Sequence, residues 1–130
     1  MKMNITAGKF LNGKLEKIYP EEKFIPFNEG MIVGEYTSKL FSDKFMEERA
    51  KVHQVSIQDY QENLREFIEF LKDIRQYDEV VLWFGEEPFC VKNTEVVLQT
   101  LQEYNFQGSI LLNIVAEETG QILKSIKKKG

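Results

Sequence analysis

Residues 79–90, EVVLWFGEEPFC, decide the fold class of this chain. An apolar run stops at Gly85, two carboxylates follow at once, and a helical pattern begins near Pro88. A run that is apolar at consecutive positions is typical of a central parallel strand covered on both faces. We therefore expect a buried strand over Glu79–Phe84, a tight turn, and a helix over Val91–Tyr104.

The rest of the chain continues this alternation of strands and helices. Further strands are expected over Met3–Ala7, Lys23–Phe27 and Ser109–Val115, and further helices over Lys9–Ile18, Phe41–Val52, Ile57–Tyr77 and Glu117–Lys127. Ser56 and Asp59 predict a cap at the start of the longest helix. The pattern favours an α/β fold, a three-layer sandwich in which helices cover both faces of a mostly parallel four-stranded sheet.

Right-handed crossovers favour the strand order 2-1-3-4. This order places the first and third strands side by side, and the chain leaves them in opposite directions. Ligands bind at such a point, beyond the carboxyl ends of the strands. The predicted site is a crevice between two loops, with a third loop at its rim. Its residues are Gly8, Lys9 and Phe10 in the first loop, Gly85, Glu86 and Glu87 in the second, and Asn28 and Glu29 at the rim.

Composition favours one domain spanning residues 1–130 and argues against several functional classes. The chain is 42% hydrophobic and 29% charged, as is usual for a globular protein. Its formal net charge of −4 makes nucleic acid an unexpected partner, because phosphate backbones select basic surfaces. The short run Lys127–Lys129 is expected to be a solvated terminus.

The absence of targeting signals favours a cytoplasmic protein. No apolar run is long enough to span a bilayer, and the N-terminal residues lack the apolar region of a secretion signal. One cysteine, Cys90, excludes an internal disulfide, and with His53 as the only histidine no zinc site is expected. Cys90 is interpreted as a small buried side chain and His53 as an ordinary helix residue. Arg49 is expected to be solvated, with a cleft-rim anion contact as its alternative.

Two polar features in the predicted site have more than one interpretation. Residues 8–14 place four residues between two glycines and then a lysine, as in a phosphate-binding loop, but Leu15 replaces the Ser or Thr that would hold Mg²⁺. An ordinary turn into a helix is the alternative, with backbone N–H groups still able to hold an anion. Glu86 and Glu87 could bind a metal, transfer a proton, or favour the helix start.

Three short features make the chain resemble the bacterial family called domain of unknown function 1835. They are the strand and glycine loop Ile5–Gly8, the strand and polar loop Ile25–Gly34, and the strand Val80–Phe84 with acidic residues after it. The resemblance spans roughly Met3 to Val115 and implies a Rossmann-like α/β domain. An acidic residue and a serine often follow the first glycine in that family, whereas Lys9 and Phe10 stand here.

Function stays open between two main hypotheses. The first is a binding module that takes a nucleotide or another small anionic ligand at the crevice. Lys9 and loop amides would neutralise the ligand, and Glu86 or Glu87 would take a hydroxyl or a metal. The second is a non-enzymatic protein–protein interaction module with a vestigial cleft. A third hypothesis is an enzyme such as a metal-dependent hydrolase, for which the sequence defines neither a base nor a cofactor. A homodimer through an edge strand or an outer helix also stays open.

Overall fold

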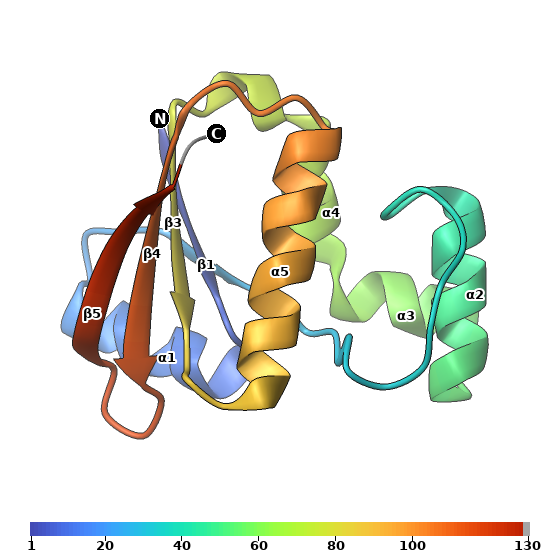
Figure 1. Ribbon diagram of the computed structural model, residues 1–130, viewed down its shortest axis with the longest axis horizontal. Coiled ribbons are helices and arrows are strands. Elements are labelled where there is room, and N and C mark those ends of the chain that lie inside the picture. The colour runs from blue at the N-terminus through green and yellow to red at the C-terminus, as the bar shows by residue number, and fades with distance from the viewer. Residues whose placement is uncertain (129–130) are drawn as a thin grey trace.

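The buried strand predicted over residues 79–84 lies in the middle of the sheet. The computed structural model, which describes residues 1–128, contains a five-stranded sheet of order β2-β1-β3-β4-β5 (Figure 1). The strands are β1 (Lys2–Thr6), β2 (Phe24–Pro26), β3 (Glu79–Phe84), β4 (Ser109–Ala116) and β5 (Gln121–Lys128). The first four pair in parallel, and β5 pairs with β4 antiparallel. The predicted order 2-1-3-4 is therefore retained within a larger, mixed sheet.

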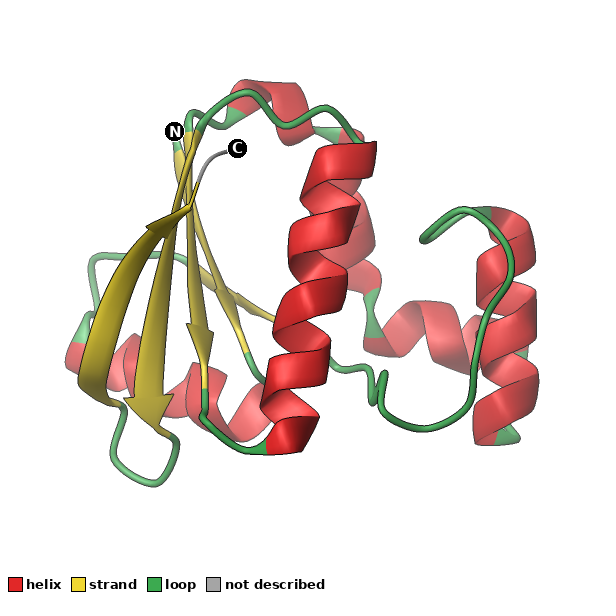
Figure 2. Ribbon diagram, viewed as in Figure 1, coloured by secondary structure: helices red, strands yellow, loops and turns green. Residues whose placement is uncertain are grey.

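Helices lie on both sides of the sheet (Figure 2). On one face, α1 (Lys9–Ile18) packs Leu11 and Leu15 against Phe24 and Trp83. A larger apolar core fills the other face, where α4 and α5 lie nearest the sheet and α2 and α3 lie farther out (Figure 1). These elements are α2 (Asp43–His53), α3 (Ile57–Asn63), α4 (Arg65–Lys72), the 3-10 turn η1 (Ile74–Gln76) and α5 (Pro88–Glu103). Within residues 1–128, no helix has the length and apolar character needed to cross a membrane.

The helix expected over Glu117–Lys127 is wrong, because this segment forms a turn and then β5. Gly120 takes a left-handed backbone conformation with φ of 79°, and its N–H donates to the carbonyl of Ala116 at 2.7 Å. This tight turn reverses the chain. The returning strand then satisfies backbone groups that β4 would otherwise leave unpaired along its edge. Pairing with β4 therefore overrides the helical pattern.

The helix expected over Ile57–Tyr77 is divided at Leu64. That residue is fully buried, but its φ of −110° and ψ of 12° end α3 and begin α4. Asn28 Nδ2 donates to the carbonyl oxygen of Asn63, beside the break, at 3.0 Å. The break allows α3 to lie against α2 and not in line with α4 (Figure 1). The ring of Tyr60 on α3 thereby stacks beside the ring of His53 on α2, with centroids 6.3 Å apart.

Serine caps set the starts of α2 and α3. Ser42 Oγ accepts a hydrogen bond from the N–H of Phe45 at 3.2 Å, so α2 begins two residues later than the predicted Phe41. Ser56 Oγ accepts from the N–H of Asp59 at 3.1 Å, which confirms the predicted cap. Each cap satisfies one of the N–H groups that the first helical turn leaves without a partner.

Candidate functional site

The carboxyl ends of β1, β2, β3 and β4 meet at one edge of the sheet, the lower edge in Figure 1. The chain leaves β1 into α1 on one face and leaves β3 into α5 on the other. Because β1 and β3 are neighbours, this is the topological switch point at which open α/β sheets bind ligands. We call this region the carboxyl edge.

The first predicted loop lies at the start of α1. Gly8 has an extended backbone, and its carbonyl accepts the N–H of Asn12 at 2.9 Å. Lys9 and Phe10 are exposed, and the side chain of Phe10 is among the most exposed apolar groups, at 70%. The first turn of α1 contains no acidic residue, so no carboxylate there offsets the partial positive charge of its N–H groups.

The rim loop approaches the first loop but directs its side chains elsewhere. A Cβ added to Gly8 would lie 3.9 Å from Asn28 Oδ1, so these two loops are neighbours. The amide of Asn28 nevertheless donates to Asn63 O, as described above. The side chain of Glu29 is fully buried, behind the carboxyl edge and not at its surface.

The second predicted loop faces the β4–β5 turn. Glu86 and Glu87 are exposed, and with Gly85 they line a shallow pocket of 290 Å³ together with Glu117 and Glu118. Gly85 is packed closely, because a Cβ there would lie 2.7 Å from Glu117 Oε2. The structure thus groups Gly85, Glu86 and Glu87 with a second acidic pair, in a pocket that Gly8, Lys9 and Phe10 do not line.

Cys90 is buried, and its thiol is hydrogen-bonded. Its Sγ donates to Glu117 Oε2 at 3.2 Å. Burial, and then the hydrogen bond to Glu117, raise the pKa of the Cys90 thiol to about 11. The nucleophilic thiolate is therefore a minor species at neutral pH. This agrees with the interpretation of Cys90 as a small buried side chain.

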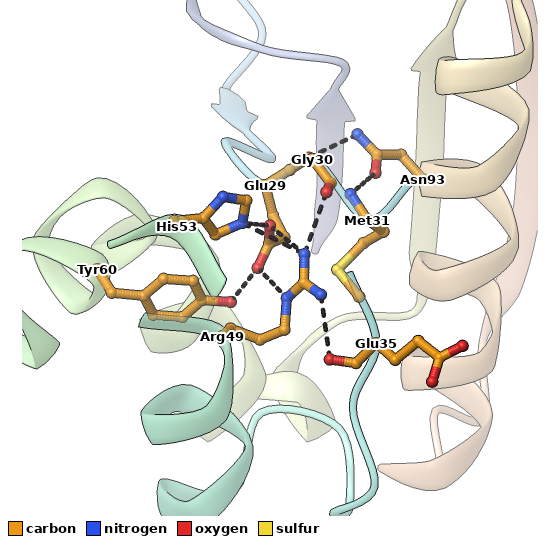
Figure 3. Close-up of polar contacts among 8 residues, drawn as sticks. All are labelled: Glu29, Gly30, Met31, Glu35, Arg49, His53, Tyr60 and Asn93. Carbon is orange, nitrogen blue, oxygen red and sulfur yellow. Dashed lines mark hydrogen bonds and ion pairs between the residues drawn. The ribbon is translucent and has the colours of Figure 1, made fainter. Parts of the chain in front are cut away.

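Beside the carboxyl edge, Glu29 is the centre of a buried polar network (Figure 3). Arg49 Nε donates to Glu29 Oε2 and Arg49 Nη2 to Glu29 Oε1, each at 3.0 Å. His53 Nε2 lies 2.5 Å from Oε1, and the Tyr60 hydroxyl donates to Oε2. The carboxylate is therefore surrounded by four donors. We call these four residues, Glu29, Arg49, His53 and Tyr60, the Glu29 network.

The Glu29 network keeps its carboxylate charged. Burial acts to raise the pKa of Glu29, but hydrogen bonds from Arg49, Tyr60 and His53 and the charge on Arg49 outweigh it, so the pKa lies below its ordinary value. Burial and the neighbouring Glu29 charge raise the pKa of Tyr60 far above its ordinary value, so the phenol stays a donor. His53 Nε2 lies between two groups of the network, 2.5 Å from Glu29 Oε1 and 3.2 Å from Arg49 Nη2, and the shorter contact to the carboxylate favours the ring tautomer with its N–H at Nε2.

The Glu29 network fixes the loop that follows β2. Arg49 Nη2 donates to the carbonyl of Gly30 at 3.1 Å. Asn93, on α5, donates from Nδ2 to the Glu29 carbonyl at 2.7 Å and accepts the Met31 N–H at 3.0 Å (Figure 3). Within residues 1–128, every buried side-chain polar atom has a hydrogen-bond partner. The Glu29 network therefore joins α2 and α3 to the rim of the carboxyl edge, and Asn93 joins α5 to the same loop.

The solvated position expected for Arg49 is wrong, because its side chain is fully buried. His53 is the last residue of α2, and its side chain is 28% exposed. A signal was present, because Arg49 follows the apolar residue Phe45 by four positions and so shares its helical face. Its partner Glu29 lies 20 residues away, and no local pattern connects the two.

Side chains that could ligate a metal do not cluster in the part of the chain that the structure describes. In residues 1–128, no group of three or more His, Cys, Asp or Glu side chains is arranged to hold a metal ion.

Comparison with protein-family models, curated proteins and solved structures finds no match to this chain. The resemblance to domain of unknown function 1835 stays a prediction, and function has to be argued from the site itself.

Proposed function

We propose that this protein is a binding module that takes a small anionic ligand, such as a nucleotide, at the carboxyl edge between β1 and β3. One observation carries this proposal: two helices begin at the switch point, and α1 begins with Gly8 and Lys9 and has no acidic residue in its first turn. Backbone N–H groups at a helix start attract anions, and a glycine permits close approach to the backbone.

The distribution of charge along the carboxyl edge supports an oriented ligand. The α1 side carries the exposed Lys9, whereas the β3 side carries Glu86 and Glu87, with Glu117 and Glu118 opposite. An anionic group would lie at the α1 side, where it is attracted, and hydroxyl or amino groups would lie toward the carboxylates. A nucleotide has this arrangement, with phosphate at one end and ribose hydroxyls beyond it.

A thermal-shift screen against nucleotides, sugar phosphates and inorganic phosphate tests this proposal. A ligand present at a hundred times its dissociation constant stabilises the folded chain by about 2.7 kcal/mol, which is roughly 10 °C in Tm for a domain of this size. Lys9→Ala should reduce that shift, whereas Lys17→Ala, in the last turn of the same helix, should not. A flat screen, or equal loss in both variants, would contradict the proposal.

The protein–protein interaction module stays as the second candidate, because apolar side chains are exposed near the same edge. Phe10 is 70% exposed and Phe89 is 42% exposed, and Ile32 and Val33 are each 51% exposed. Under this alternative, Phe10→Ser with Phe89→Ser abolishes capture of a partner, and Lys9→Ala has no effect. The ligand-binding proposal expects the opposite sensitivity to Lys9.

A further inference from the structure

The sheet ends at β5, and its outer backbone has no partner in the described chain. β5 is eight residues long and pairs with β4 alone among the strands. In an antiparallel pair, alternate residues direct their N–H and C=O groups away from the partner. Nearly every side chain of β5 is exposed, with Ile126 the half-buried exception. Such an edge is a template for an additional strand.

β5 also carries more positive charge than the other strands of this acidic protein. Lys124, Lys127 and Lys128 are exposed, and within residues 1–128 none of them forms an ion pair. The β4 residues that pair with them, Ile114, Leu111 and Ile110, carry no charge. The whole chain has a formal net charge of −4, so the positive charge here is a local feature.

The register of β5 determines which side chains a further strand would meet. The ladder skips Leu123, which forms a bulge, and is regular from Lys124 to Lys128. Alternation places Lys124, Ile126 and Lys128 on one face of the sheet. Ile126 packs against the larger apolar core, so it is an apolar position between two cations.

We propose that the β5 edge binds an extended acidic segment of another protein as a sixth strand. The segment has the pattern acid-x-apolar-x-acid, with the acidic residues beside Lys124 and Lys128 and the apolar residue beside Ile126. The pattern is symmetric, so it suits either strand direction. A second copy of this chain is the less favourable occupant, because two β5 strands would bring six lysines together. This surface is separate from the carboxyl edge and goes beyond the function proposed there.

The test is a titration of ¹⁵N-labelled protein with the peptide GSETVTEGS, followed by NMR. We expect amide shifts confined to Gln121–Lys128 and slower hydrogen exchange at the outward N–H groups. Lys124→Glu with Lys128→Glu should weaken binding by at least about tenfold, since each cross-strand pair changes from attraction to repulsion. The peptide GSKTVTKGS, in which lysines replace the two glutamates, should then bind the doubly substituted protein better than it binds the wild type.

The matched control is Lys44→Glu with Lys51→Glu, which makes the same change in net charge on α2. It should leave the affinity for GSETVTEGS within about twofold at 0.15 M salt, where exposed charges are largely screened beyond about 8 Å. Equal weakening by both double variants would overturn the proposal, as would shifts outside β5 or no binding at millimolar peptide. A concentration-dependent dimer of the free protein that protects the β5 amides would also overturn it, in favour of a second copy.

Discussion

At the scale of single residues, the Glu29–Arg49 pair is the fully buried ion pair of the described chain. Both side chains are fully buried, and their bidentate pairing is completed by His53 and Tyr60. A buried pair of this kind contributes little net stability relative to apolar residues, but removing one partner leaves a charge without compensation. The network therefore fixes one arrangement of the rim loop more than it strengthens the fold.

Arg49→Met should lower the free energy of unfolding by about 3–5 kcal/mol, because it leaves the Glu29 carboxylate buried without its cation. Chemical denaturation with urea measures this change. Arg65→Met is the matched control, since Arg65 is exposed and lies 3.3 Å from Glu62 and 3.8 Å from Glu69. Arg65→Met should lower the free energy of unfolding by at most about 1 kcal/mol. A similar decrease for the two variants would contradict a buried, charge-compensating role for Arg49.

The depressed pKa of Glu29 predicts a loss of stability in acid. Its folded-state pKa lies below the ordinary value, so the unfolded chain takes up a proton first as the pH falls. The stabilisation is complete above the unfolded pKa of about 4.3 and is lost as the pH falls through the folded value. Unfolding free energies measured across this range should fall less steeply for Glu29→Gln than for the wild type. Parallel profiles would show that Glu29 does not contribute.

Residue identity predicted where the candidate loops lie better than it predicted which contacts they make. Gly8, Lys9 and Phe10 lie at the start of α1 as expected, and Glu86 and Glu87 lie exposed before α5. Glu29 was selected because its loop follows β2, yet its partners come from α2 and α3. Those partners depend on how the helices pack, and sequence spacing carries no information about that packing.

At the scale of elements, local pattern predicted the parallel strands and α1 but missed β5 and the break at Leu64. The runs around Val81 and Leu112 are apolar at consecutive positions, and such runs are typical of a strand buried on both faces. The final segment has no comparable signal, because nearly all of its side chains are exposed and its backbone is paired along the β4 ladder. The break at Leu64 depends on tertiary packing around a fully buried side chain.

Replacing two glycines by alanine should change the stability of the fold in opposite directions. Gly120→Ala should destabilise the fold by about 1–3 kcal/mol, because φ is 79° and the new Cβ would lie 3.1 Å from Leu15 Cδ2. Gly13→Ala should stabilise α1 by about 0.5–1 kcal/mol, since nothing lies within 4 Å of its Cβ position. Thermal unfolding of both variants measures the difference. A neutral Gly120→Ala would contradict the left-handed turn between β4 and β5.

At the scale of the whole molecule, the sheet carries two distinct surfaces. The carboxyl edge gathers two helix starts and the rim loop, and the Glu29 network holds that rim in place. The β5 edge lies at the end of the sheet and presents lysines and open backbone. Ligand binding at the first and strand addition at the second can therefore be tested with separate variants.

Gly8→Ala tests ligand binding at the carboxyl edge without disturbing the fold. Its backbone is extended, and a Cβ there has no neighbour closer than the 3.9 Å to Asn28 Oδ1, so the fold should accept the methyl group. The same methyl group would obstruct an anion approaching the first N–H groups of α1. We expect an unchanged far-UV circular dichroism spectrum and at least a fivefold weaker affinity for any nucleotide that binds, measured by isothermal titration calorimetry. Unchanged affinity would place the ligand elsewhere.

The most direct test of the proposed function is amide chemical-shift mapping of ¹⁵N-labelled protein with the ligand that gives the largest thermal shift. We expect the largest changes at the amides of residues 8–12, with a second group at residues 85–89. The structure also has a pocket of 560 Å³ that residues of α2, α3 and α4 line, among them Met46, Gln61 and Ile68. Changes confined to that pocket, or to β5, would contradict a binding site at the carboxyl edge.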